Sequence, residues 1–171
     1  MGTGQTMLTM LAMVLMSFLL LRVNSLFLQT NTTLFTTKFE VLAFSLGQSM
    51  FQEIESEAFD QSTVTAVVSS TASLSTVLGP ETGETYNTFN DIDDFNNYTR
   101  TVSNLPSAIF YIKCKVEYVN SATPDVATST RTWNKRITVF VTSPSMMTNA
   151  KDVTKADTVK VSQVFSYWIF K

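Results

Sequence analysis

Histidine is absent from this chain of 171 residues, and Cys114 is its single cysteine. Without histidine, neither a Ser-His-Asp triad nor a Cys-His pair can form, and a zinc site would lack its commonest ligand. The sequence also has no glycine-rich phosphate-binding loop. A lone cysteine cannot form an internal disulfide, and we expect Cys114 to be a small buried residue rather than a reactive thiol. The sequence therefore predicts a protein that is not an enzyme and needs no cofactor.

Charged residues make up 15% of the chain, whereas soluble domains have about 25%. The net charge is −2 and the basic residues do not cluster, so nucleic-acid binding is not predicted. Charged residues are scarcest at the N-terminus, where Arg22 is the first charged residue. No basic residue precedes the apolar run from Met7 to Val23 and no small-x-small site follows it, so we do not expect a cleaved secretory signal.

Proline and glycine are scarce in the first third of the chain. Pro80 is the first proline, and Gly47 is the single glycine within residues 5–78. This pattern predicts one long helix from Gly4 to about Phe59, apolar in its first half and amphipathic in its second. A helix of roughly 55 residues would be roughly 80 Å long, which exceeds the width of a small domain. Much of it must therefore pack against lipid, against other copies of the chain, or against both.

The second half of this helix carries a wide apolar stripe with spacings of three, four and seven residues. Its members are Leu26, Phe27, Leu34, Phe35, Phe39, Leu42, Leu46, Phe51 and Ile54. The stretch from Gln29 to Thr37 is the weakest part, because threonine and asparagine are poor helix formers. Threonine hydroxyls can hydrogen-bond to the preceding turn, so we expect this stretch to remain helical within an assembly.

The remainder of the chain predicts an antiparallel sheet. Residues 61–90 are rich in serine, threonine and glycine and indicate an irregular region with at most one short strand. Apolar and polar residues then alternate over Ile109–Tyr118, Thr130–Thr142 and Asp157–Phe170, with a hairpin-type loop over 120–129. Strands joined by short loops favour an antiparallel sheet with one buried face.

The predicted fold is therefore α+β, with a long N-terminal helix packed on a C-terminal antiparallel sheet. The helix occupies residues 1–59, of which 1–23 form a hydrophobic segment, and a β-rich domain occupies residues 60–171. One face of the first long strand is expected to cover the C-terminal half of the helix. That face consists of Ile112, Cys114, Val116 and Tyr118.

An acidic stretch precedes the predicted sheet. Asp91, Asp93 and Asp94 offer oxygen ligands of the kind that Ca²⁺ prefers. However, the stretch lacks the glycine and the distant glutamate of an EF-hand loop. We therefore favour a solvated turn with Asx caps over a metal site.

Three segments carry a resemblance to a known family: the helix that begins MGTGQTMLTM, the loop DIDDFNNYTR, and the strand pair KRITVFVTSP and DTVKVSQVFSYW. In this order the chain resembles a type IV pilin or pilin-like protein. The resemblance implies a homopolymeric filament at the cell surface, an inner-membrane pool before assembly, a prepilin peptidase and a pilus assembly machinery. It also implies that assembly depends on Met1, Gln5, Met7, Leu8, Leu11, Leu15, Phe18, Leu19, Arg22, Phe27 and Phe35.

The chain departs from the pilin pattern at its start. No basic leader is present, so either Met1 is the mature residue or cleavage follows Gly4 and leaves Gln5 first. If Met1 is mature, Gln5 stands where the family usually has a glutamate, and an amide cannot supply the charge for pairing with a neighbour's terminal amine. The continuous helix looks more like an archaeal filament subunit, and Asn31 and Asn97 lie in Asn-x-Ser/Thr sequons.

Two function classes follow from the sequence. In the first, the protein is a structural filament subunit whose apolar helices bundle together. In the second, it is a single-span membrane-anchored protein whose β-domain is a binding or adhesion module. The segment from Asn24 to Phe39 favours the filament, because a simple anchor does not need apolar residues beyond the charge at Arg22. The sequence leaves open whether such a filament serves adhesion, motility, DNA uptake or surface sensing.

Overall fold

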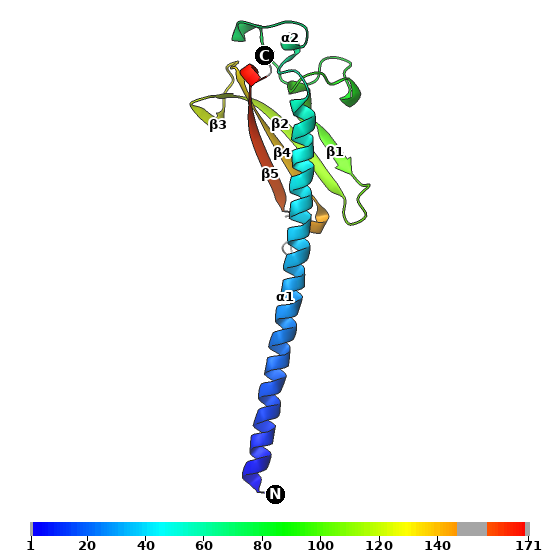
Figure 1. The fold of residues 1–171 in the computed structure, drawn as a ribbon, viewed down its shortest axis with the longest axis vertical. Helices are drawn as coiled ribbons and strands as arrows, with labels where there is room; N and C mark the ends of the chain where they lie inside the picture. Colours follow the sequence, from blue (N-terminus) through cyan, green and yellow to red (C-terminus); the bar gives the residue numbers. More distant parts are fainter. Residues whose placement is uncertain (1, 147–156, 170–171) are drawn as a thin grey trace. The chain divides into compact units, whose positions relative to one another are not determined.

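The computed structural model describes residues 2–146 and 157–169 of the chain. It divides into two compact units, Met1–Lys38 and Phe39–Lys171, and each is described by itself below. The helix α1, Thr3–Glu55, supplies all of the described secondary structure of the first unit and the beginning of the second (Figure 1). The prediction of one long helix is confirmed, although the helix ends at Glu55 rather than at Phe59.

In the first unit, the threonine-rich stretch is helical because its hydroxyls are hydrogen-bonded within the helix. The Oγ1 atoms of Thr30, Thr32 and Thr33 donate to carbonyls four residues earlier, at 2.9–3.0 Å. Thr36 Oγ1 donates to Thr32 O at 3.1 Å in the same way. These bonds remove the main competition that threonine offers to a helix, namely bonding to the backbone in other conformations.

In the second unit, the C-terminal part of α1 packs on the sheet. Its buried residues are Ala43, Gly47, Met50, Phe51 and Ile54. A Cβ atom placed on Gly47 would lie 3.3 Å from Val161 Cγ2 and 3.8 Å from Val141 Cγ2. The single glycine of the helix interior therefore lies where the helix packs tightly against the valines of β4 and β5.

The sheet has five strands: β1 (Thr99–Val102), β2 (Phe110–Asn120), β3 (Thr123–Ala127), β4 (Asn134–Thr142) and β5 (Thr158–Ser166). All of its strand pairs are antiparallel, in the order β1-β2-β4-β5, and β3 pairs with the end of β2 (Figure 1). In the register, Cys114 faces Val139 and Val139 faces Val161. The three predicted strands are present, although β4 begins at Asn134 rather than Thr130 and β5 ends at Ser166. Residues 167–169, predicted as strand, form a 3₁₀-helix, and Phe170 lies outside the described residues.

Strands β1 and β3 were not predicted, and both are short and polar. Strand β1 reads TRTV, and strand β3 is fully exposed, so neither has a buried face that would produce apolar alternation. Pro124 lies in β3, which pairs with β2, and proline is tolerated in such a peripheral strand because one side of the strand needs no N–H donor. The segment that we expected to be a hairpin loop thus forms part of the hairpin itself.

Short helices connect these elements. The region from residue 61 to residue 95 contains α2 (Gln61–Val64) and the 3₁₀-helices Thr71–Ser73, Tyr86–Thr88 and Asp93–Phe95. Two more 3₁₀-helices, Pro144–Met146 and Tyr167–Ile169, follow β4 and β5. No strand is assigned among residues 61–90, all of which are described, so this region is irregular as predicted.

The core of the second unit lies between α1 and the sheet. Ile112, Cys114, Val116 and Tyr118 are at most 4% exposed, and they share one cluster with Phe51 and Ile54 of the helix. The rings of Phe51 and Phe165 stack with centroids 6.3 Å apart, which ties the helix to β5. The predicted inward face of β2 is therefore confirmed.

Candidate functional sites

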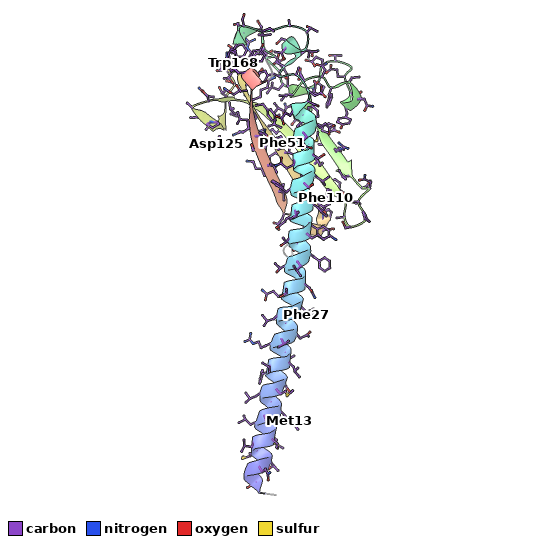
Figure 2. The ribbon with its side chains drawn as sticks, viewed as in Figure 1. Met13, Phe27, Phe51, Phe110, Asp125 and Trp168 are labelled. Atoms are coloured by element: carbon purple, nitrogen blue, oxygen red, sulfur yellow. The ribbon has the colours of Figure 1, made fainter. Side chains whose placement is uncertain are left out.

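The first candidate is the apolar surface of α1 in the Met1–Lys38 unit, which we call the apolar helix surface. Large apolar side chains from Met7 to Phe35 are exposed, and Figure 2 shows Met13 and Phe27 projecting from the helix. Eight of the predicted assembly residues belong to it and are 58–75% exposed: Met7, Leu8, Leu11, Leu15, Phe18, Leu19, Phe27 and Phe35. Gln5 and Arg22 are also exposed, and Met1 lies outside the described residues.

Such a surface is unusual for a water-soluble protein, because exposed apolar patches beyond a few hundred Å² mark interaction sites. A helix that is apolar all round is normally buried in protein or in lipid. By length and composition alone, α1 contains a segment able to cross a membrane. The surface also continues beyond Arg22, because Phe27 and Phe35 are 65% and 61% exposed.

The two predicted sequons differ in their surroundings. Asn31 is half-buried on α1, where the backbone is helical. Asn97 is exposed in the loop before β1 and has a φ of 63°, and its N–H donates to Cys114 O at 3.1 Å. Asparagine is among the few residues that adopt this left-handed conformation readily. Of the two predicted glycosylation sequons, the one at Asn97 therefore has the more accessible asparagine side chain.

The second candidate lies in the Phe39–Lys171 unit, around a buried lysine. The alternation of β4 directs Lys135 to the same face as Ile137 and Val139, and its side chain is 0% exposed. Its Nζ donates to Phe59 O at 2.7 Å, to Asp60 Oδ2 at 2.9 Å and to Asp93 Oδ1. All three ammonium donors are thus used, as a buried charge requires.

Asp60 links this lysine to the start of α2. It caps α2, with Oδ1 accepting from Ser62 N at 3.2 Å, and it also accepts from Ser75 N at 3.1 Å and from the Tyr118 hydroxyl at 3.2 Å. Burial alone would raise the pKa of this carboxyl, but the charge and hydrogen bond of Lys135 hold it below its ordinary value. Asp60 is therefore ionised and paired within the core.

The acidic stretch is buried rather than solvated, so our prediction of a solvated turn is wrong. Asp91, Asp93 and Asp94 are at most 1% exposed. Asp91 Oδ1 accepts from Asp93 N at 2.7 Å, an Asx-type bond, while Asp93 pairs with Lys135. Burial and the neighbouring Asp93 raise the pKa of Asp91 to about 9. The turn is held inside because Ala58 pairs with its backbone at Asn90 and Ile92.

The predicted calcium ligands do not converge as a set of three. Instead, Asp94 lies beside two glutamates of the preceding loop. One carboxylate oxygen each from Glu81, Glu84 and Asp94 lies within 4.8 Å of the other two, and we call this group the carboxylate cluster. Burial and the neighbouring carboxylates of Glu84 and Asp94 raise the pKa of Glu81 to about 7. An arrangement of this kind can bind a hard cation or share a proton.

Asn90 orients this cluster. Its Nδ2 donates to Glu84 Oε1 at 2.9 Å, and Glu84 Oε2 accepts from Glu81 N at 3.0 Å. Asp94 Oδ2 accepts from the backbone N–H groups of Asn90 and Asp91 at 2.9 and 3.2 Å. The carboxylates of Glu84 and Asp94 are therefore held in place by backbone and amide donors.

Sequence reasoning missed Lys135, Asp60, Glu81 and Glu84. The sequence did contain a sign that Lys135 is buried. Lys135, Ile137 and Val139 are alternate residues of one strand, so their side chains lie on the same face of the sheet. No comparable signal marked the glutamates, which lie in an irregular loop. Cys114 was predicted correctly as a buried residue, and burial raises the pKa of its thiol to about 12. At that pKa the reactive thiolate is scarce at neutral pH.

Comparison of the chain with protein-family models, with curated proteins and with solved structures found no match.

Proposed function

We propose that this protein is the structural subunit of a pilin-like helical filament, in which the apolar helix surfaces of many copies pack against one another. The observation that carries this proposal is the extent of that surface. It runs from Met7 to Phe35, about 29 residues or about 43 Å of helix. The hydrocarbon core of a bilayer is only about 30 Å thick, so one membrane crossing leaves part of the surface uncovered.

A bundle of identical helices covers the whole length of this surface. Each copy then buries aromatic and aliphatic side chains on both sides of Arg22, and contacts between helices replace contacts with lipid as a subunit leaves the membrane. The architecture is compatible with this role, because a long apolar N-terminal helix packed on an antiparallel sheet is also the pilin arrangement. On this proposal the partners are other copies of the chain, the membrane before assembly, and a prepilin peptidase with its assembly machinery.

Electron microscopy of material sheared from cells that express the chain tests this proposal. We expect negatively stained filaments that contain the full-length protein. Leu15→Asp should abolish them, because a mid-helix aspartate costs about 2.5–3.5 kcal/mol on membrane-insertion scales and has no basic partner before Arg22. In the bundle, the same carboxylate would be buried without compensation in every copy.

Leu15→Met is the matched control, since it keeps an apolar side chain of similar volume at the same position. Filaments should persist in this variant. Recovery of the wild-type protein only as membrane-bound monomers would instead support the single-span anchor with a binding β-domain, and the filament proposal would then be wrong.

A further inference from the structure

We propose that Glu81, Glu84 and Asp94 form a binding site for Ca²⁺ that joins the irregular loop to the 3₁₀-helix Asp93–Phe95. This site lies wholly within the Phe39–Lys171 unit, and the proposal does not depend on filament assembly. Three observations carry it: the spacing of the carboxylates, the buried oxygens that lack donors, and the absence of a nearby cation in the described core.

The spacing matches calcium coordination. One oxygen from each of the three carboxylates lies within 4.8 Å of the others. Ca²⁺ binds oxygen ligands at about 2.3–2.6 Å, so two ligands of one ion lie at most about 5 Å apart. Glu81 and Glu84 come from one turn, in which Glu84 N donates to Glu81 O at 3.1 Å, and Asp94 comes from the 3₁₀-helix Asp93–Phe95. Oxygen-only ligands of this charge suit a hard cation rather than zinc or copper.

The unsatisfied oxygens are an observation separate from the spacing. Asp94 is 0% exposed; its Oδ2 has two backbone donors, whereas its buried Oδ1 has no hydrogen-bond partner among the described residues. Glu81 Oε2 and Asn90 Oδ1 are likewise buried without a donor in the described part of the chain. Buried polar atoms normally have partners, and an unpaired carboxylate oxygen is costly. A cation in the cluster would satisfy such oxygens.

The local charges lead to the same conclusion. Lys135 is the buried cation of the described core, and its three donors are used by Phe59 O, Asp60 and Asp93. None remains for the carboxylate cluster. Asn90 donates through Nδ2 to Glu84, which supplies a neutral hydrogen bond but no charge. Among the described residues, no ion pair joins a basic side chain to Glu81, Glu84 or Asp94.

Calorimetric titration with CaCl₂ and thermal unfolding, both on the full chain in detergent, test the proposal. Unfolding can be followed by intrinsic fluorescence, since both tryptophans, Trp133 and Trp168, lie in the Phe39–Lys171 unit. We expect one Ca²⁺ per chain and a Tm at least about 4 °C higher in 1 mM CaCl₂ than in EGTA. Mg²⁺ should bind at least about 10-fold more weakly, because it requires a tighter octahedral set of ligands.

Glu81→Gln and Glu84→Gln keep the side-chain shape, and each should weaken Ca²⁺ binding at least about 10-fold and reduce the Tm difference. Asp125→Asn is the control, since Asp125 is an exposed carboxylate on β3 (Figure 2) and should leave binding unchanged. The Ca²⁺ titration and the Tm comparison of the wild-type chain test the proposal even if a variant fails to fold. Equal Tm values in CaCl₂ and EGTA, full Ca²⁺ affinity in both glutamine variants, or equal binding of Mg²⁺ would each overturn the proposal.

Discussion

At the scale of single residues, the second unit is organised around one buried charge. Lys135 has no contact with water, and it compensates Asp60 and Asp93 by direct contact. Its ammonium also lies over the rings of Phe59 and Tyr118, at 4.6 and 5.4 Å from their centroids. Buried ion pairs of this kind contribute little net free energy compared with apolar residues, but breaking one is costly.

Lys135→Met therefore tests the role of this charge. It should lower the free energy of unfolding by about 3–5 kcal/mol, because two buried carboxylates lose their cation. Denaturant unfolding of the full chain in detergent, followed by tryptophan fluorescence, measures the change. Lys113→Met is the control, since Lys113 is exposed on the outer face of β2. A loss of less than about 1 kcal/mol in Lys135→Met would contradict this account.

Asp60 provides a pH-dependent test of the same network. Although burial opposes ionisation, Lys135 lowers the pKa of Asp60 in the folded state, so the carboxylate stabilises the protein above the unfolded pKa of about 3.9. That contribution is lost as the pH falls through the folded pKa. The difference in unfolding free energy between wild type and Asp60→Asn should therefore be large at pH 6 and shrink below about pH 4. A difference that is constant across this range contradicts the prediction.

Residue types alone predicted the burial of Cys114 but not that of the aspartates. A small apolar thiol on an alternating strand has one favourable place, the core. An aspartate is normally exposed, and its burial here depends on Lys135, which lies 42 residues from Asp93 in the sequence. Such a long-range partner leaves no local pattern, and the same holds for Asp94 with its two glutamates.

At the scale of elements, the packing of α1 on the sheet depends on Gly47. A Cβ at this position already comes within 3.3 Å of Val161 Cγ2, so a large side chain cannot be accommodated without moving β5 or the helix. Gly47→Leu should destabilise the Phe39–Lys171 unit by about 1–3 kcal/mol despite its better helix propensity. Gln48→Leu, at an exposed position one residue on, is the control in the same unfolding assay. Equal stability of the two variants would show that the contact is not restrictive.

The sequence predicted the elements that carry a periodic apolar face and missed those that do not. The C-terminal part of the helix, β2 and β4 bury side chains in a regular order, and β5 packs Val159, Val161 and Phe165 against the core. Each of these elements was anticipated. Strands β1 and β3 form through backbone pairing with β2 and have no residue buried in the core. Almost any sequence can form backbone hydrogen bonds with a neighbouring strand, so the sequence of β1 and β3 does not mark them as strands.

At the scale of the whole molecule, the two units differ in whether their apolar side chains are buried within the unit. The Phe39–Lys171 unit has its own buried core, whereas the Met1–Lys38 unit has exposed apolar side chains along its described length from Met7 onward. Such a surface needs a partner from outside the chain. A membrane would cover the part near Met7–Leu21 in both proposals. The filament proposal differs from the anchor proposal in what covers the apolar side chains beyond Arg22.

Replacing Phe27 and Phe35 together by serine separates the two proposals. Burial of a phenylalanine contributes about 1.5–3 kcal/mol, so the pair contributes about 3–6 kcal/mol per subunit if both are covered in a bundle. The concentration needed for assembly should then rise by about 10²–10⁴-fold, and filaments should disappear from sheared material. Membrane retention should persist, because the apolar run from Met7 to Leu21 is intact.

The matched control replaces both residues by leucine, which keeps the surface apolar and should preserve filaments. Quantitative microscopy of sheared fractions, with immunoblots of the membrane fraction, measures both outcomes in the same cells. If the serine variant assembles as well as the leucine variant, the apolar residues beyond Arg22 are not buried between copies. If instead both phenylalanines insert into lipid, the serine variant loses membrane retention while the leucine variant keeps it, and contact with lipid explains the surface beyond Arg22.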